Sequence, residues 1–172
     1  MPTEIERKFL VDDPAGVPRA DGPGMLLRQG YLAEDGDVQV RVRDAGGATT
    51  MTAKVGRGVS RHEVEVTIGR ADFDALWVAT AGRRVHKTRH RIPLGAAADT
   101  DAAAPVADRL VAELDEYGDD LAGLWLVEVE FPTLDAAEAF TPPAWFGREV
   151  TGDAAWSNAA LARHGRPDRS TG

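Results

Sequence analysis

The first residues that could carry chemistry are two glutamates and a lysine near the start of the chain, Glu4, Glu6 and Lys8. If this stretch is a strand, all three side chains lie on one face, because side chains alternate between the two faces of a strand. Residues two apart lie roughly 6.5 Å from each other along the strand. Two carboxylates at that distance repel each other unless a cation lies between them or water covers them. A solvated charged face would be enough to explain one such pair.

The same spacing recurs along the chain, in both acidic pairs and basic pairs. The acidic members are Glu4, Glu6, Glu63, Glu65, Glu113, Asp115, Glu128 and Glu130. The basic members are Lys8, Arg28, Arg41, Arg43, Lys54, Arg61, Lys87 and Arg89.

Repeated pairs of this kind indicate more than a wet surface, because solvation alone does not require them. Mg²⁺ takes oxygen ligands in an octahedron and uses a few carboxylates together with substrate phosphates. A phosphate chain needs the complement, which is several Arg and Lys donors arranged along its length. Carboxylates and cations on one shared face therefore predict a metal-assisted phosphoryl-transfer site.

Strands must position most of these residues. Alternating patterns predict strands over residues 3–11, 25–33, 38–43, 48–55, 60–68, 83–94 and 123–131, and the segment 106–117 fits either a helix or a strand. Helical spacing predicts helices over 70–82, 133–140 and 154–164, and 12–24 and 95–105 are expected to be loops. About eight strands joined by short turns indicate an antiparallel sheet or a closed barrel.

The overall composition predicts one domain, 1–172, with a sizeable core. There is no cysteine, no signal peptide and no run of about 18 apolar residues, which favours a cytoplasmic protein with no membrane partner. A formal net charge of −8 argues against binding of nucleic acid by the whole surface.

The ordered set of motifs resembles the CYTH, or triphosphate tunnel metalloenzyme, superfamily. The stretch from Glu4 to Lys8 matches its Glu-x-Glu-x-Lys motif, and LRQGYL, VRVR, MTAK, SRHEVEV, KTRH, ELDEY and LVEVEF follow in the order expected for small bacterial members. The resemblance covers almost the whole chain. It implies a mainly β (α+β) fold: an antiparallel eight-stranded closed β-barrel forming a tunnel, with helices packed outside and a short C-terminal helix.

The resemblance also implies a role for each group of charged residues. The positions that match metal ligands for Mg²⁺ or Mn²⁺ are Glu4, Glu6, Asp115, Glu128 and Glu130, with Glu113 as a further acidic position. Those that match binding of the phosphate chain are Lys8, Arg28, Arg41, Arg43, Lys54, Arg61, Lys87 and Arg89. Glu63 or Glu65 could hold the attacking water, and Lys87 or Tyr31 could assist the leaving oxygen, although packing would also explain Tyr31.

These expectations lead to one function and several alternatives. The predicted reaction is metal-dependent hydrolysis of a linear triphosphate, most simply inorganic tripolyphosphate, by a monomer or homodimer. Adenylate cyclase and thiamine or nucleoside triphosphatase activities remain open on the same barrel, as does a polyphosphate-binding module without turnover. One departure from the family lies at 150–156, where relatives often have Asp-Lys-Arg-Tyr and this chain lacks the basic residue, which bears on how one tunnel end is closed.

Overall fold

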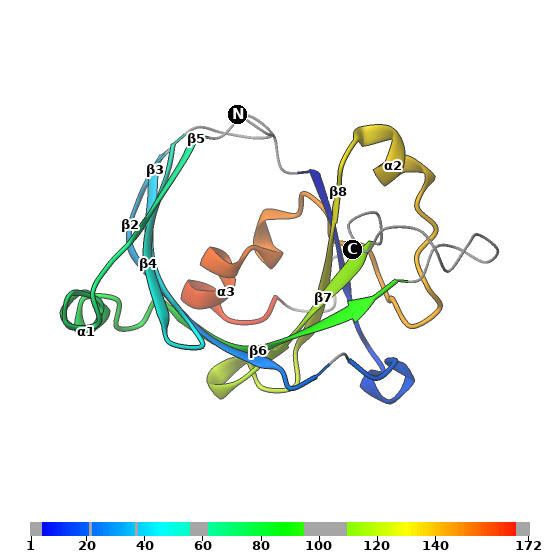
Figure 1. Cartoon of the computed structure of the whole chain (residues 1–172), viewed down its shortest axis with the longest axis horizontal. Coiled ribbons are helices and arrows are strands. Elements are labelled where there is room, and N and C mark those ends of the chain that lie inside the picture. Colours follow the sequence, from blue (N-terminus) through cyan, green and yellow to red (C-terminus); the bar gives the residue numbers. More distant parts are fainter. Residues whose placement is uncertain (1–4, 21, 37, 56–61, 95–109, 168–172) are drawn as a thin grey trace.

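The structure, a computed structural model, describes residues 5–20, 22–36, 38–55, 62–94 and 110–167. Glu4 and Arg61, both predicted site residues, lie outside the described residues, as does the expected loop 95–105. One antiparallel eight-stranded sheet dominates the fold and curves strongly around a central space (Figure 1). Its strands follow the spatial order β1-β8-β7-β6-β2-β3-β4-β5.

The strands agree closely with the alternating patterns of the sequence. They are β1 (Ile5–Leu10), β2 (Met25–Asp35), β3 (Val38–Ala45), β4 (Ala48–Val55), β5 (His62–Thr67), β6 (Arg84–Pro93), β7 (Val111–Tyr117) and β8 (Trp125–Phe131). The segment that fitted a helix or a strand is therefore a strand, β7. It pairs with β6 on one side and β8 on the other, so its backbone is fully used within the sheet.

The closed barrel that the family resemblance implied is not confirmed. β1 and β5 are the two ends of the strand order, and no pairing joins them within the described residues. The outer edge of β1 bonds instead to a later segment: the Leu10 amide donates to the Arg148 carbonyl at 2.9 Å, and the Val150 amide donates to the Lys8 carbonyl at 2.8 Å. Because this segment occupies part of the β1 edge, the sheet is curled but open.

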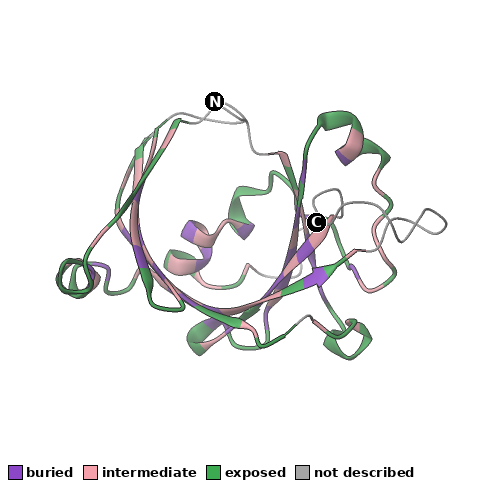
Figure 2. Cartoon of the chain, viewed as in Figure 1, coloured by how far each residue is buried: buried purple, intermediate pink, exposed green. Residues whose placement is uncertain are grey.

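Two helices lie on the convex side of the sheet, as predicted. These are α1 (Arg70–Val78) and α2 (Leu134–Ala139). Phe73 of α1 is completely buried, and the rest of the helix is largely exposed (Figure 2). α2 begins after Thr133, whose hydroxyl accepts from the Ala136 amide at 3.1 Å.

The predicted C-terminal helix is split and lies on the concave side of the sheet. A 3₁₀ turn at Ala154–Trp156 precedes α3 (Asn158–His164), and the Ser157 hydroxyl caps α3 by accepting from the Ala160 amide at 3.1 Å. Figure 1 shows α3 within the curve of the strands, and it contacts β6 and β2.

The apolar core is divided between the two sides of the sheet. On the convex side, Phe9, Phe131 and Phe146 pack with residues of β7, β8 and α2. On the concave side, Trp156 and Leu161 cover one end of the inner wall. The remaining part of the concave side is therefore where the charged side chains can gather.

Candidate functional site

The concave side of the sheet, here called the inner face, carries most of the predicted site residues. Strand register fixes this, because residues opposite each other in neighbouring strands point to the same side. Among the described residues on the inner face are Glu6, Lys8, Gln29, Tyr31, Arg41, Arg43, Thr52, Lys54, Glu63, Glu65, Lys87, Arg89, Glu113, Asp115, Glu128 and Glu130.

Arg28 is the exception, because the register of β2 places it on the side of the sheet away from the other predicted substrate-binding residues. It lies on the convex side, where its guanidinium pairs with Asp44 at 2.6 Å and lies over the rings of Phe73 and Trp77. Arg28 and Tyr31 have opposite parity, and the irregularity of β2 comes only after Tyr31. Only one of the two can therefore face inward, and it is Tyr31. Gln29, two residues before it, faces inward as well.

The inner face has two halves of different charge. The acid-rich half comprises the inward residues of β1, β6, β7 and β8: Glu6, Lys8, Lys87, Arg89, Glu113, Asp115, Glu128 and Glu130. The base-rich half comprises those of β2 to β5: Gln29, Tyr31, Arg41, Arg43, Thr52, Lys54, Glu63 and Glu65.

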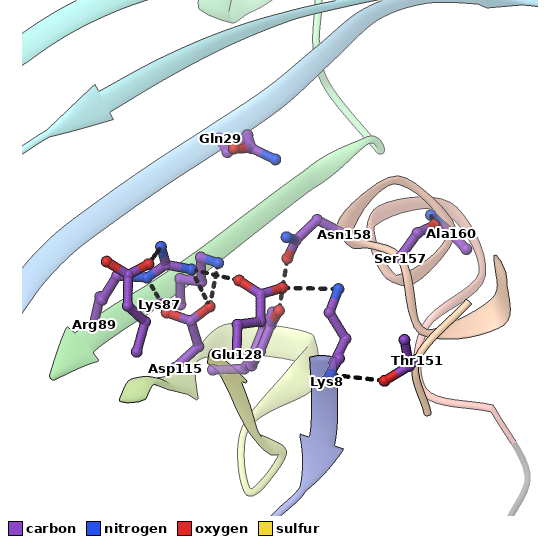
Figure 3. Close-up of polar contacts among 12 residues, drawn as sticks. Lys8, Gln29, Lys87, Arg89, Asp115, Glu128, Thr151, Ser157, Asn158 and Ala160 are labelled. Atoms are coloured by element: carbon purple, nitrogen blue, oxygen red, sulfur yellow. Dashed lines mark hydrogen bonds and ion pairs between the residues drawn. The ribbon is translucent and has the colours of Figure 1, made fainter. Parts of the chain in front are cut away.

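In the acid-rich half, Arg89 and Asp115 form the centre of an ion-pair network (Figure 3). Two nitrogens of Arg89 bond to the two oxygens of Asp115, both at 2.7 Å. Lys87 also pairs with Asp115, and both of these side chains are 1% exposed. Glu128 joins the network through Arg89 at 3.0 Å and through Lys8 at 2.8 Å. Cations and carboxylates here neutralise each other.

The protonation of this network follows from burial and charge together. Burial alone would raise the pKa of Glu128, but Lys8, Lys87 and Arg89 outweigh it and hold the pKa well below its usual range. Burial works against Arg89, yet its hydrogen bonds to Asp115 and the nearby carboxylates raise its pKa. Burial lowers the pKa of Lys87, which the charge of Asp115 only partly offsets.

The base-rich half has fewer compensating carboxylates. Glu63 pairs with Lys54 at 2.7 Å and with Arg41 at a longer 3.4 Å. The Nε atom of Arg41 is buried and has no hydrogen-bond partner among the described residues. Arg43 has no ion pair within the described part of the chain, and burial together with the charges of Arg41 and Arg89 lowers its pKa. Donors held in this way favour an incoming anion.

The base-rich half also contains one further carboxylate, Glu65, and the hydroxyl groups of Thr52 and Tyr31. Thr52 donates its hydroxyl hydrogen to Glu65 at 2.9 Å. Tyr31 is 2% exposed, and burial raises its pKa to about 12, so it keeps its hydrogen at any physiological pH. It lies directly opposite Arg41 in the register of β2 and β3.

The predicted metal ligands include two carboxylates from neighbouring strands. Glu6 and Glu130 lie directly opposite each other in the β1–β8 register, and Glu128 is opposite Lys8. Carboxylates directly opposite on neighbouring strands destabilise a sheet unless a cation compensates them, and carboxylate oxygens are the donors that Mg²⁺ and Mn²⁺ prefer. The donor type therefore fits a divalent metal.

The described carboxylates are not arranged as a complete metal-coordination site. Over residues 5–20, 22–36, 38–55, 62–94 and 110–167, no group of three or more His, Cys, Asp or Glu side chains is arranged to hold a metal. Asp115, Glu113 and Glu128 are each held by a neighbouring cation instead.

Comparison with known proteins decides the family. No protein-family model matches the chain. An inorganic triphosphatase from Nitrosomonas europaea is 45% identical over 161 residues, covering 93% of this chain and 97% of the relative. The chain belongs to the CYTH, or triphosphate tunnel, superfamily.

One further relative and one solved structure support this placement. An inorganic triphosphatase from Acetivibrio thermocellus is 32% identical over 167 residues, covering 95% of this chain and 96% of the relative. The crystal structure of an inorganic triphosphatase shares 42% identity with this CYTH protein, with a TM-score of 0.70, and covers 95% of this chain and 96% of that chain.

Sequence reasoning missed three residues of this CYTH protein's site. Gln29 bonds to both Arg43 and Tyr31 on the inner face. Tyr117 lies beneath the Lys87 ammonium and donates its hydroxyl hydrogen to Asn158 of α3 at 2.6 Å. Gln29 shares the parity of Tyr31 in the sequence, and that signal would have located it, whereas nothing in the sequence indicates the contact between Tyr117 and Asn158.

Proposed function

We propose that this protein hydrolyses a linear triphosphate, with inorganic tripolyphosphate as the substrate and pyrophosphate and phosphate as products. The carrying observation is the base-rich half of the inner face, where Arg41 and Arg43 present donors that no described carboxylate fully compensates. A short polyanion supplies the missing acceptors. The identity to inorganic triphosphatases over almost the whole chain supports the same substrate class.

The residues divide the work between the two halves of the inner face. Arg41, Arg43 and Lys54 bind and align the phosphate chain, in place of Arg28, which lies on the other side of the sheet. Lys8 and Arg89 complete the cationic wall after exchanging a carboxylate partner for a phosphate oxygen. Fixing the chain in line for attack is the main contribution a protein makes to phosphoryl transfer.

Glu6, Glu128 and Glu130 would hold a divalent metal, Mg²⁺ or Mn²⁺, with Glu4 from outside the described residues. When bound, such a metal neutralises charge that develops on the phosphate oxygens. Asp115 is proposed to orient Lys87 and Arg89, and Glu113 to orient Arg89.

Two further roles concern protons. Glu65, bonded only to the neutral Thr52 hydroxyl among the pairs described for it, is better placed than Glu63 to hold an attacking water, because Lys54 occupies Glu63. Lys87 and Tyr31 are the candidate donors to the leaving oxygen, and the raised pKa of Tyr31 makes it a hydrogen-bond donor and not a base.

Further expectations concern the domain organisation, location, partners and oligomeric state of the protein. None of the described helices has the length and apolar character needed to cross a membrane. One domain over 1–172, a cytoplasmic location, no nucleic-acid or membrane partner and a monomer or homodimer remain predictions. A polyphosphate-binding module without turnover is disfavoured, because a pure anion binder gains nothing from carboxylates that repel its ligand.

Phosphate release by the purified chain tests the proposal. Tripolyphosphate, ATP, thiamine triphosphate and pyrophosphate are supplied in turn, first with Mg²⁺ and then with Mn²⁺, and products are identified by ³¹P NMR. We expect tripolyphosphate to be the best substrate, pyrophosphate to accumulate, and a chelator to abolish release. Cyclic AMP from ATP would identify a cyclase, and binding without release under either metal would identify the non-catalytic module.

A further inference from the structure

Gln29 is a buried, uncharged residue in the middle of a charged wall. Its side chain is 1% exposed and projects from β2 on the side of the sheet that carries Arg89, Asp115 and Glu128 (Figure 3). In the register it lies opposite Arg43 of β3 and Val85 of β6. A buried amide must find partners for both its oxygen and its nitrogen, so its contacts have a defined direction.

Arg43 sets that direction. Its Nε–H donates to Gln29 Oε1 at 2.9 Å, and a guanidinium nitrogen can only donate. The amide oxygen of Gln29 must therefore face Arg43, and the amide nitrogen faces the other neighbour. That neighbour is Tyr31, whose hydroxyl oxygen accepts from Gln29 Nε2.

The direction of this chain determines what Tyr31 can do. Since its oxygen accepts from Gln29, its own hydrogen remains to be donated, and none of the hydrogen bonds within the described residues uses it. Arg41, directly opposite in the register, has a buried Nε–H that likewise lacks a described partner. Two donors from facing residues thus await an acceptor on the same side of the sheet.

We propose that Gln29 is a positioning residue that fixes Tyr31 as a hydrogen-bond donor towards a phosphate oxygen and leaves the terminal nitrogens of Arg43 for the same anion. The part that concerns catalysis rests on the proposed function. Gln29 itself touches no reacting atom, and it acts through the hydrogen that it leaves on Tyr31 and through the nitrogen of Arg43 that it occupies.

Gln29→Glu tests the direction with almost no change of size. A carboxylate accepts on both oxygens, so the contact with Arg43 is kept while Tyr31 has to donate to the new side chain. Its hydrogen is then withdrawn from the substrate. We expect kcat on tripolyphosphate to fall about 100-fold, the loss that follows removal of one preorganised donor.

Gln39→Glu is the matched control for charge. Gln39 also lies on the inward side of β3 and donates to Glu34 at 2.9 Å, but it contacts neither Tyr31 nor Arg43. It adds a negative charge to the same side of the sheet without reaching Tyr31, so it should raise KM and keep kcat, whereas Gln29→Glu loses kcat. An equal loss of kcat in the two variants would overturn the proposal.

A double-mutant cycle with Tyr31→Phe separates positioning from damage to the fold. If Gln29 acts through Tyr31, then Gln29→Glu should lower kcat little further once the hydroxyl is gone. A full additional loss in the Tyr31→Phe background would contradict the proposal. If the carboxylate prevents folding, Gln29→Met keeps the volume and removes the hydrogen bond that orients the Tyr31 hydroxyl, and its loss of kcat should likewise be small in the Tyr31→Phe background.

A measurement without substrate keeps this inference separate from the proposed function. The chain has 2 tyrosines, so protein carrying ¹³Cζ-labelled tyrosine gives two signals, assigned with Tyr31→Phe and Tyr117→Phe. The Cζ shift of Tyr31 should change on Gln29→Glu, because the phenol turns from acceptor to donor, and that of Tyr117 should not. An unchanged Tyr31 signal overturns the inference even in an active enzyme, and a changed signal supports it even if tripolyphosphate is not hydrolysed.

Discussion

The two halves of the inner face use the same kinds of charged residue to different ends. In the acid-rich half, Asp115 is held by Lys87 and Arg89, and Glu128 by Lys8 and Arg89. In the base-rich half, Arg43 has an amide as its described partner and Arg41 has a buried, unpartnered Nε. The carboxylates Asp115 and Glu128 of the acid-rich half are paired with cations, whereas Arg41 and Arg43 of the base-rich half keep unused donors.

This difference teaches that rich charge does not by itself make a binding surface. A cation that is already bonded to a buried carboxylate must give up that partner before it can bind phosphate, which costs free energy. A guanidinium with unused donors can bind phosphate without giving up a partner. An incoming anion therefore has no carboxylate to displace from Arg43, whereas it must displace one from Arg89.

Glu130→Gln removes a proposed metal ligand from the acid-rich half, and of the variants predicted here it should lower activity the most. Losing a carboxylate ligand weakens the charge that steadies the transition state, and we expect kcat/KM to fall roughly 1,000-fold at ordinary Mg²⁺, partly recovered at high Mg²⁺. Steady-state phosphate release over a Mg²⁺ series measures this.

Glu116→Gln is the control for that variant, since Glu116 lies on the other side of β7 with its side chain 47% exposed. It should keep wild-type rates. Wild-type activity in Glu130→Gln would refute the ligand role, and so would a loss that is the same in both variants.

Asp115→Asn and Glu63→Gln compare the halves by stability. Asp115 is 1% exposed, and its removal leaves Lys87 buried without its carboxylate, so the free energy of unfolding should fall by roughly 3 kcal/mol. Glu63 is 30% exposed and its pairs are solvated, so its loss should cost less than about 1 kcal/mol. Urea unfolding in the presence of a chelator measures both. Equal losses would erase the distinction between the halves.

Arg41→Ala removes the unpartnered donor of the base-rich half. Charge-assisted hydrogen bonds to phosphate are lost, and we expect KM for tripolyphosphate to rise roughly 10-fold to 50-fold with a smaller change in kcat. Arg28→Ala is the matched control on the convex side, where the guanidinium serves Asp44 and the aromatic rings of α1. It should leave KM unchanged and affect only stability. A KM effect in Arg28→Ala as large as in Arg41→Ala would return Arg28 to the substrate.

The pattern of alternation explains how much of this could be predicted from sequence. A period of two assigns strands and their faces wherever charged and apolar residues alternate cleanly. In β3, for example, Val40 and Val42 lie on one face of the strand, and Arg41 and Arg43 lie on the other. The β2 strand lacks that alternation, since Gly30 and buried polar residues interrupt it, and there Arg28 was assigned to the wrong face.

Other features depend on contacts between segments far apart in sequence. The open edge of the sheet follows from the bonds of β1 to Arg148 and Val150, which no local pattern encodes. The placement of α3 on the concave side depends on Trp156, Leu161 and the bond from Tyr117 to Asn158. Which carboxylates are neutralised by which cations is likewise a property of side-chain packing, so the two halves could not be distinguished from residue types alone.

The smallest effect that still separates the halves is the pH dependence of stability. The pKa values of Glu128 and Glu63 are both lowered in the folded protein, in each case against the effect of burial, by Lys8 and its neighbours for Glu128 and by Lys54 for Glu63. A lowered carboxyl pKa contributes stability that is present above the ordinary value of about 4.3 and is lost as the pH falls through the folded pKa. Metal-free protein should therefore lose stability below about pH 4.3, and Glu128→Gln should flatten that loss more than Glu63→Gln, because Glu128 has three cations around a buried carboxylate. Unfolding free energies from pH 7 down to pH 3 would show it, and a greater flattening by Glu63→Gln would mean that the base-rich half, and not the acid-rich half, contains the more strongly coupled charges.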